Sequence, residues 1–214
     1  GMTPDRVAAS IASFDFLYLT ELERLKIVAP SVRSSDSRVH VAQQGGHVLE
    51  PLTGMHRNVW VFDFKSLYPS IIRTFNIDPL TYVPPHAATP DMDLIRTPNG
   101  VTFRREPGIL PEVVARLWAA RDAAKRDGDA LASQAIKILM NSLYGVLGSP
   151  ASRLFSPPVA SAIPLAGQWV IRVAARAASS RPGHRVLYGD TDSLFVDVGE
   201  PDPEKAAAYA DVLR

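Results

Sequence analysis

A tight turn between two short apolar runs is encoded by Tyr188-Gly189-Asp190-Thr191-Asp192-Ser193. The flanking residues from 185 to 198 predict a strand, a turn and a second strand, with Asp190 and Asp192 at the tip of the hairpin. An Asp-x-Asp pair on a turn is common, and an aspartate in such a place is most often a turn former. The two aspartates alone therefore do not predict a functional site, and a second acidic segment beside the hairpin is required for that prediction.

A second acidic strand end lies upstream, in Asp63-Phe64-Lys65-Ser66-Leu67-Tyr68-Pro69-Ser70-Ile71-Ile72. The residues from 58 to 64 include a continuous apolar run, which predicts a strand buried on both faces. A short helix is expected to follow, with Ser66 as its cap and Pro69 in its first turn. Taken alone, Asp63 would most often be a turn former or a cap.

Together the two segments predict an acidic site. In a sheet, the tip of a hairpin can lie beside the end of a neighbouring strand, so Asp63, Asp190 and Asp192 can converge. Carboxylates that are held close together cost free energy unless a cation lies between them. No His or Cys cluster competes for a metal, and an all-oxygen site selects Mg²⁺ or Mn²⁺ over Zn²⁺.

A cationic helix face is predicted between these segments, in Lys137-Ile138-Leu139-Met140-Asn141-Ser142-Leu143-Tyr144-Gly145. Lys137, Asn141 and Tyr144 stand at i, i+4 and i+7, so they share one stripe of the helix. In the preceding predicted helix, Arg121 and Lys125 stand at i and i+4, and a short polar turn makes the two helices an antiparallel hairpin. A solvated charged face is the more frequent explanation for Arg121 and Lys125 alone. If these cations instead converge across the hairpin, they would bind a triphosphate. A nucleoside triphosphate is also the kind of substrate on which a carboxylate-bound Mg²⁺ acts.

In this order the three segments resemble motifs A, B and C of the family B DNA polymerases, from about residue 14 to residue 198. The resemblance implies an α+β palm, an antiparallel sheet backed by helices, with a helical-hairpin fingers insertion. The implied parts are an N-terminal helix and linker at 1–45, a first palm segment with motif A at 46–100, the fingers with motif B at 101–150, and a second palm segment with motif C at 151–214 that stops before the thumb.

The resemblance also implies residue roles. Asp63 and Asp192 are expected to bridge two Mg²⁺ ions, which Mn²⁺ can replace, with the backbone carbonyl of Phe64 as a further ligand. Asp190 matches an acid whose contact with the metal is less direct. The nucleotide is assigned to Arg121, Lys125, Lys137, Asn141 and the backbone amides of Leu67 and Tyr68. The ring of Tyr68 is expected to be the steric gate against ribonucleotides, and the base pair and template side are assigned to Tyr144, Gly145 and Asn141.

The implied activity is template-directed DNA synthesis, in which a primer 3′-hydroxyl attacks the α-phosphorus of a deoxynucleoside triphosphate. Its implied partners are primer–template DNA, dNTPs and a sliding clamp that binds through regions outside this chain. Two other hypotheses stay open: a non-catalytic polymerase-like scaffold that binds nucleic acid, and a two-metal nuclease. A scaffold would not keep the whole constellation of site residues, and a nuclease would not need the cationic hairpin or Tyr68.

The composition bounds these expectations. The 214 residues carry a formal net charge of +1, so affinity for nucleic acid must come from local patches or from other parts of a larger protein. The absence of Cys fits a reducing compartment, and no apolar run is long enough to span a membrane, so the cytoplasm and its nucleoid are the expected location.

Upstream exonuclease motifs and a downstream thumb are not found, and Gln43 stands where many family members have Tyr before the Gly-Gly pair. The chain is therefore expected to be a core taken from a larger enzyme, or a naturally minimal relative.

The remaining elements are expected as a strand at 48–49, a loop over 31–44, an irregular proline-rich excursion over 78–100, and helices over 4–28, 111–126, 130–144 and 159–180, the third ended by Gly145 and the last bent early by Pro164.

Overall fold

The computed structural model describes residues 10–31, 45–200 and 202–207. Two compact units make up the chain: a hairpin unit built from residues 1–43 and 68–163, and a sheet unit built from residues 44–67 and 164–214. The first part of the expected helix over 4–28, most of the expected loop over 31–44, and Gln43 lie outside the described residues. Across the described part of the chain, no helix combines the length and apolar character that crossing a membrane requires.

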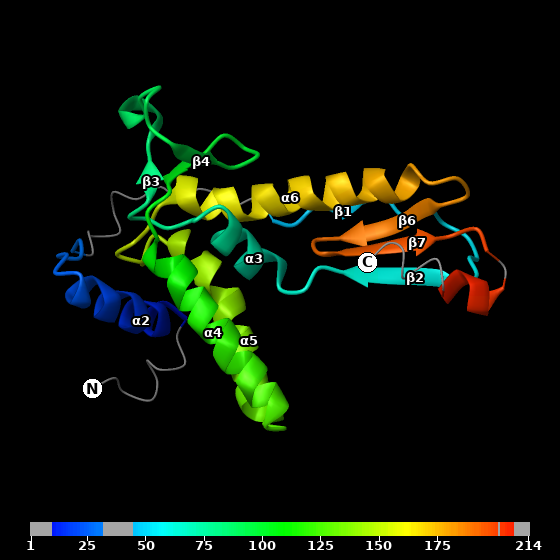
Figure 1. The fold of residues 1–214 in the computed structure, drawn as a ribbon, viewed down its shortest axis with the longest axis horizontal. Coiled ribbons are helices and arrows are strands. Elements are labelled where there is room, and N and C mark those ends of the chain that lie inside the picture. The colour runs from blue at the N-terminus through cyan, green and yellow to red at the C-terminus, as the bar shows by residue number, and fades with distance from the viewer. Residues whose placement is uncertain (1–9, 32–44, 201, 208–214) are drawn as a thin grey trace. The chain divides into compact units, whose positions relative to one another are not determined.

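The sheet unit contains four antiparallel strands in the order β1-β6-β7-β2 (Figure 1). Their bounds are β1 Val48–Leu49, β2 Val59–Asp63, β6 Arg185–Asp190 and β7 Ser193–Asp197. The predicted strand at 48–49 and the predicted hairpin are thus confirmed, and the strand predicted over 58–64 is observed over 59–63. Residues 203–207, next to the end of the described chain, are helical.

One face of this sheet is apolar because alternate strand residues point to the same side. Leu194, Val196 and Val198 form a buried cluster with Ile171 and Ala178 of helix α6 (Pro157–Ser179), and Trp60, Phe62 and Phe64 pack against it. The intervening β2 residue Val61 is 54% exposed, so the prediction of a strand buried on both faces is wrong. β2 is the last strand in the order, and its alternation leaves one face of the apolar run without cover.

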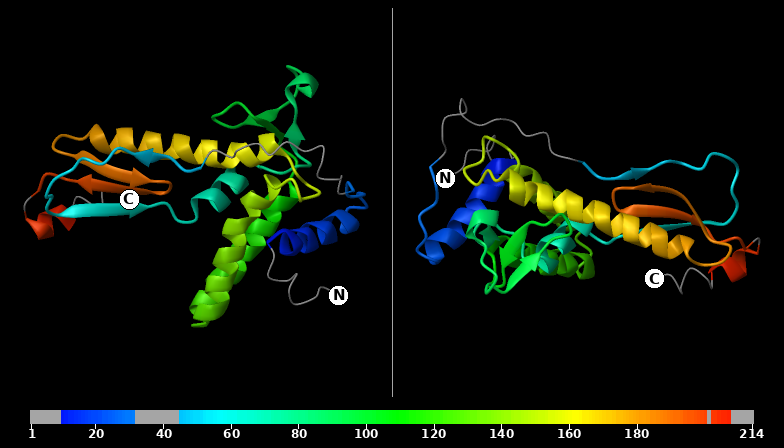
Figure 2. Two further views of the ribbon diagram at one scale, coloured as in Figure 1. Left: turned by 180° about the vertical axis from the view of Figure 1, so that it is seen from behind. Right: turned by 90° about the horizontal axis from the view of Figure 1, so that it is seen from above.

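The hairpin unit is mainly helical and includes the first residues of α6. Its other helices are α2 Ser10–Arg24, α3 Leu67–Thr74, α4 Ile109–Arg126 and α5 Ala130–Leu147, with Leu67 itself counted in the sheet unit. α4 and α5 lie side by side in every view (Figures 1 and 2), which confirms the helical hairpin. Asp129 begins α5 by accepting the N–H of Ala132 on its side chain at 2.9 Å, and the chain reverses just before it at Gly128, whose φ is 74°.

Gly145 does not end α5, contrary to prediction, since the helix continues to Leu147 and Gly148 stands at its C-cap. Glycine inside a helix costs only about 1 kcal/mol relative to alanine. Burial of Val146 and Leu147 beyond it outweighs that cost. The last long helix, α6, contains Pro164 in its interior, and it starts at Pro157.

The proline-rich stretch over 78–100 is not wholly irregular, which corrects a third expectation. A small antiparallel sheet of order β3-β5-β4 forms from Tyr82–Val83, Leu94–Arg96 and Thr102–Arg104, with a 3₁₀ turn, η2, at Pro85–Ala87. Phe103 of the central strand is fully buried. Strands of two or three residues carry almost no periodic signal, so long-range packing decides them.

A buried polar network holds the first turn of α4. Gly108 at the N-cap has no side chain, and the cap is supplied from elsewhere: Asp78 Oδ2 accepts the N–H of Leu110 at 2.6 Å, and Asn76 Oδ1 accepts the N–H of Gly108 at 3.0 Å. The hydroxyl of Tyr18 donates to Asp78 Oδ1 at 2.7 Å. Burial raises the pKa of the Asp78 carboxyl above its ordinary value, although the Leu110 N–H and the Tyr18 hydroxyl act against the rise.

Candidate active site

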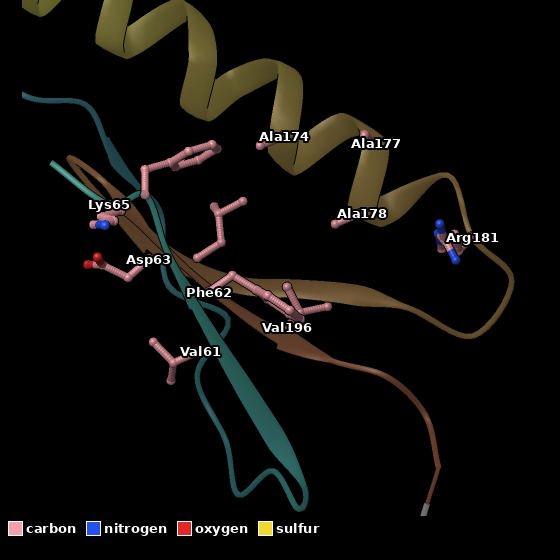
Figure 3. Close-up of a pocket in the computed structure, with 11 residues that line it drawn as sticks. Val61, Phe62, Asp63, Lys65, Ala174, Ala177, Ala178, Arg181 and Val196 are labelled. Carbon is pink, nitrogen blue, oxygen red and sulfur yellow. The ribbon is translucent and has the colours of Figure 1, made fainter. Parts of the chain in front are cut away.

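Two of the predicted acids lie in one row across the sheet. Ser193 at the start of β7 pairs with Asp63 on one side and with Asp190 on the other. Residues paired in this way have their Cα atoms about 4.5–5.5 Å apart and point to the same face. Because Phe62, Phe64 and Leu194 occupy the face toward α6, this row faces away from the helix, and Figure 3 shows the Asp63 carboxylate on that side of the strand.

The third acid, Asp192, is joined to the end of β2 by the backbone. The N–H of Phe64 donates to the carbonyl of Asp192 at 2.8 Å, which ties the residue after Asp63 to the hairpin tip. Asp63 and Asp190 are exposed, whereas Asp192 is half-buried. The sheet therefore brings the three predicted acids to one end of β2, β6 and β7.

The position directly before Asp190 has little room for a side chain, which explains why it is a glycine, Gly189. A Cβ atom at this position would lie 2.8 Å from Leu49 Cδ1 and 2.8 Å from Leu194 Cδ2. Real Cβ contacts are longer than this, so a side chain here would force the ends of the Leu49 and Leu194 side chains to move, and it would also crowd the Ser193 carbonyl at 3.2 Å. The glycine lets the acidic turn sit directly on the packed sheet.

The donor set of this acidic end is suited to a hard cation. Among the described residues, no three His, Cys, Asp or Glu side chains are grouped as a metal site. Carboxylate oxygens of Asp63 and Asp192 and the backbone carbonyl of Phe64 are the ligand types that Mg²⁺ and Mn²⁺ prefer. Mg²⁺ is typically held by one or two carboxylates together with substrate phosphates and water, so the residues present fit such an ion.

The predicted cationic stripe lies on the exposed side of α5. Lys137 and Asn141 are exposed and Tyr144 is half-buried. The opposite side of the helix carries buried Met140 and Leu143. The stripe is thus available to a ligand while the rest of α5 packs, and Gly145, also exposed, adds no side chain beside it.

On the neighbouring helix α4, the predicted cations differ in exposure. Arg121 is half-buried and Lys125 is exposed near the helix end. Tyr68, in the first turn of α3, contacts Tyr144 edge-on with the ring centroids 4.8 Å apart. The structure therefore joins the predicted gate residue to the predicted stripe through two aromatic rings. The residue before it, Leu67, is buried.

The predicted site residues fall into both units. Asp63, Phe64, Leu67, Asp190 and Asp192 belong to the sheet unit. The hairpin unit holds the others: Tyr68, Arg121, Lys125, Lys137, Asn141, Tyr144 and Gly145. Thr191 is not among the predicted site residues. Its hydroxyl donates to Asp190 Oδ1 at 2.9 Å, and its φ of 52° is the unusual backbone value that lets the tip turn.

Comparison with known proteins identifies the class. Residues 8–214 match the family model of DNA polymerase family B, so the chain belongs to that family. It is 40% identical to DNA polymerase II of Escherichia coli over 215 residues, which are 97% of this chain and 26% of that protein. It is 35% identical to a DNA polymerase of Archaeoglobus fulgidus over 196 residues, 85% of this chain and 24% of that protein.

The fold is also similar to that of a solved family B structure. The chain is similar to the family B DNA polymerase of the archaeon Pyrobaculum calidifontis, with a TM-score of 0.68 and 28% sequence identity over 96% of this chain and 28% of that one. The resemblance to family B inferred from the three motifs is confirmed, as is the α+β fold class. The chain spans about a quarter of the length of these relatives.

Proposed function

We propose that this chain is the palm and fingers of a template-directed DNA polymerase, which transfers deoxynucleotides from dNTPs to a primer 3′-hydroxyl. The observation that carries the proposal is the row of Asp63, Ser193 and Asp190, with Asp192 tied to Phe64, in a chain of family B. The assignment of fingers to 101–150 and of palm segments to 46–100 and 151–214 belongs to the same proposal.

The acids of the sheet unit serve as the metal site in this proposal. Asp63 and Asp192, with the carbonyl of Phe64, would hold Mg²⁺, and Asp190 would support them from the end of β6, which β7 separates from β2. Two bound divalent ions would stabilise the charge on the attacking and leaving oxygens of an in-line displacement at phosphorus. The chain itself supplies the spacing of the carboxylates, because Asp63 ends β2, Asp190 ends β6 and Asp192 lies in the turn that leads into β7 between them.

In this proposal the nucleotide is bound by residues of the hairpin unit and by the backbone of Leu67. Lys137, Arg121 and Lys125 bind the triphosphate oxygens, since Lys offers compact charge and Arg a planar fork. Asn141, Tyr144 and Gly145 face the base pair and template, and the backbone amides of Leu67 and Tyr68 contribute donors to phosphate oxygens. The Tyr68 ring occupies the space beside the sugar that a 2′-hydroxyl would need.

In the reaction, the primer 3′-oxygen forms a bond to the α-phosphorus while the bond to the pyrophosphate oxygen breaks. The hydroxyl proton leaves to solvent, and pyrophosphate carries away the negative charge. No side chain forms a covalent intermediate, so catalysis rests on positioning and on charge stabilisation. The partners are primer–template DNA and dNTPs, and a sliding clamp would bind through other regions of the gene product.

Primer extension with defined templates tests the proposal. The complete gene product and the 214-residue chain are assayed side by side with Mg²⁺ and each dNTP. Template-matched addition by the complete gene product supports a polymerase. Loss of label from DNA with Mg²⁺ but no nucleotide would point to a nuclease instead, and absence of both activities, without metal-dependent dNTP binding, would point to a non-catalytic scaffold.

A further inference from the structure

The acidic turn of the sheet unit is overlaid by the segment 45–49, which no role described above uses. The N–H of Thr191 donates to the carbonyl of His47 at 3.0 Å. β1 continues the pairing, with Val48 opposite Asp190 and Leu49 opposite Gly189. This segment, which we call the strap, therefore contacts the turn at successive positions through backbone groups.

Gly46 is the point of closest approach between strap and turn. A Cβ atom at Gly46 would lie 2.8 Å from Thr191 Cβ and 2.8 Å from Thr191 Cγ2, and it would overlap Thr191 Oγ1. Rotation of the threonine side chain gives no relief, because its Cβ atom is fixed to the backbone and both branches are large. Any side chain at Gly46 must therefore displace the turn or the strap. At the adjacent Gly45, an added Cβ atom would meet nothing within 4 Å.

Thr191, which Gly46 contacts, is directly connected to Asp190 and Asp192. The Thr191 hydroxyl donates to Asp190 Oδ1 at 2.9 Å, and Thr191 separates Asp190 from Asp192 in the chain. Thr191 has a φ of 52°, which a β-branched residue adopts only when its surroundings impose it. The strap supplies such surroundings through the bond from the Thr191 N–H to His47 and the close approach of Gly46.

Two further hydrogen bonds within the sheet unit hold the chain before and after Gly46. Gln168 Nε2 of α6 donates to the carbonyl of Gly45 at 2.8 Å, and the N–H of Leu52 donates to the carbonyl of Leu187 at 2.8 Å. The strap is thus held on both sides of Gly46. These bonds oppose movement of the strap away from the turn, so a substitution at Gly46 is expected to shift the turn.

We infer that Gly46 is a positioning residue, which sets the carboxylates of Asp190 and Asp192 by close packing of the strap on Thr191. The inference rests on the proposed function insofar as those carboxylates serve a metal. The structural coupling itself, from Gly46 to Thr191 to Asp190, does not depend on metal. The two parts can therefore be tested with separate measurements.

The experiment compares Gly46→Ala with Gly45→Ala in the 214-residue chain. Hydrogen exchange of the peptide covering 188–193 is measured without metal, and Mn²⁺ binding is measured by electron paramagnetic resonance. Gly46→Ala is expected to speed exchange of the Thr191 amide and to weaken Mn²⁺ binding about tenfold or more, as loss of support for metal ligands does. Gly45→Ala is expected to leave both unchanged.

A double-mutant cycle keeps the inference falsifiable if Gly46→Ala folds poorly. Thr191→Gly removes the atoms that the new Cβ atom would strike and tolerates a positive φ. Adding Gly46→Ala to Thr191→Gly should then change neither exchange nor Mn²⁺ binding further, as expected when the first substitution removes the interaction. Thr191→Ser, which keeps the hydroxyl, should bind Mn²⁺ more tightly than Thr191→Val, which loses the bond to Asp190.

The outcomes separate the two ideas. Equal exchange in Gly46→Ala and Gly45→Ala would overturn the coupling whatever the metal does. Faster exchange with unchanged Mn²⁺ binding would overturn the positioning role. If the unsubstituted chain binds no Mn²⁺, the proposed metal site fails, while the exchange comparison still decides whether Gly46 holds the turn.

Discussion

Asp78 and Asp63 show how one residue type serves two purposes in the same chain. Asp78 is fully buried, and its two carboxylate oxygens accept three short hydrogen bonds, from the Tyr18 hydroxyl and from the N–H groups of Leu80 and Leu110. Asp63 is exposed at the end of a strand, in a row with another acid. An aspartate that organises the fold is enclosed by donors, whereas one proposed for chemistry keeps its oxygens accessible to a ligand.

The same contrast holds for two other residue types. Tyr18 is buried and donates to Asp78, whereas Tyr68 is half-buried against the ring of Tyr144. Arg116 is bound to Glu21 at 2.6 Å, whereas Lys137 lies on the exposed stripe of α5. In each pair, substitution of the enclosed residue is expected to affect stability, and substitution of the residue in the proposed site is expected to affect activity. The opposite result in any pair would contradict the contrast.

The largest difference is expected between Asp63→Asn and Asp78→Asn. Asp63→Asn in the complete gene product should lower primer extension by about a thousandfold, since a bridging carboxylate is worth several kcal/mol of transition-state stabilisation. Its thermal midpoint should stay unchanged. Extension within tenfold of the unsubstituted protein would remove Asp63 from the metal site.

Asp78→Asn should have the opposite profile. An amide NH₂ would then face donors that now bond to a carboxylate, at a cost of about 1–3 kcal/mol in the free energy of unfolding. Urea denaturation of the chain measures this cost. Extension per folded molecule should stay normal, and a specific loss of activity would show that the buried network also serves the reaction.

Lys137→Ala and Arg116→Ala sharpen the comparison for cations. A charge-assisted contact with phosphate is worth about 1.5–3 kcal/mol, so Lys137→Ala should weaken dNTP binding roughly 10- to 150-fold and largely spare primer–template binding. Arg116→Ala should leave nucleotide binding unchanged, because its partner is Glu21. Fluorescence titrations with nucleotide and with DNA distinguish these results. If Lys137→Ala loses only DNA binding, the stripe contacts DNA instead.

Tyr68→Ala is expected to act on sugar choice. Removing the ring opens the space beside the sugar, and the ratio of ribonucleotide to deoxynucleotide incorporation should rise at least about tenfold, as loss of a repulsive element predicts. Single-nucleotide incorporation kinetics with matched rNTP and dNTP measure the ratio. Unchanged discrimination would make Tyr68 a packing residue of Tyr144.

The smallest effect is expected from Tyr18→Phe, and its pH dependence carries the information. Loss of the hydroxyl should cost about 1–3 kcal/mol in the free energy of unfolding at neutral pH. The Tyr18 hydroxyl lowers the pKa of Asp78, so the variant raises that already elevated pKa further. A carboxyl whose folded pKa is raised favours the folded state only at low pH, and stability falls as pH rises through the folded pKa. The difference between variant and unsubstituted chain should therefore shrink at acidic pH, as paired urea titrations can show.

Local patterns in the sequence were sufficient for the long elements. The helical hairpin follows from apolar spacing with Asp129 and Gly128 at the reversal, and the acidic hairpin follows from a turn between two apolar runs. The family also follows from the sequence, because the three motifs occur in order with the side-chain types that the chemistry needs. These signals depend only on residues close together in the chain.

Other features of the fold and of the site depend on contacts between residues far apart in the sequence, and only the tertiary structure shows them. The short strands around Phe103, the extension of α5 past Gly145 and the exposure of Val61 are set by which surfaces meet. The row from Asp63 through Ser193 to Asp190 required the strand order β6-β7-β2, and the fit of Gly46 on Thr191 required a segment far away in sequence to cross the turn. The sequence by itself determined which acids, cations and aromatic rings are present. Their register and spacing came from backbone pairing and packing between distant segments, for which no local pattern codes.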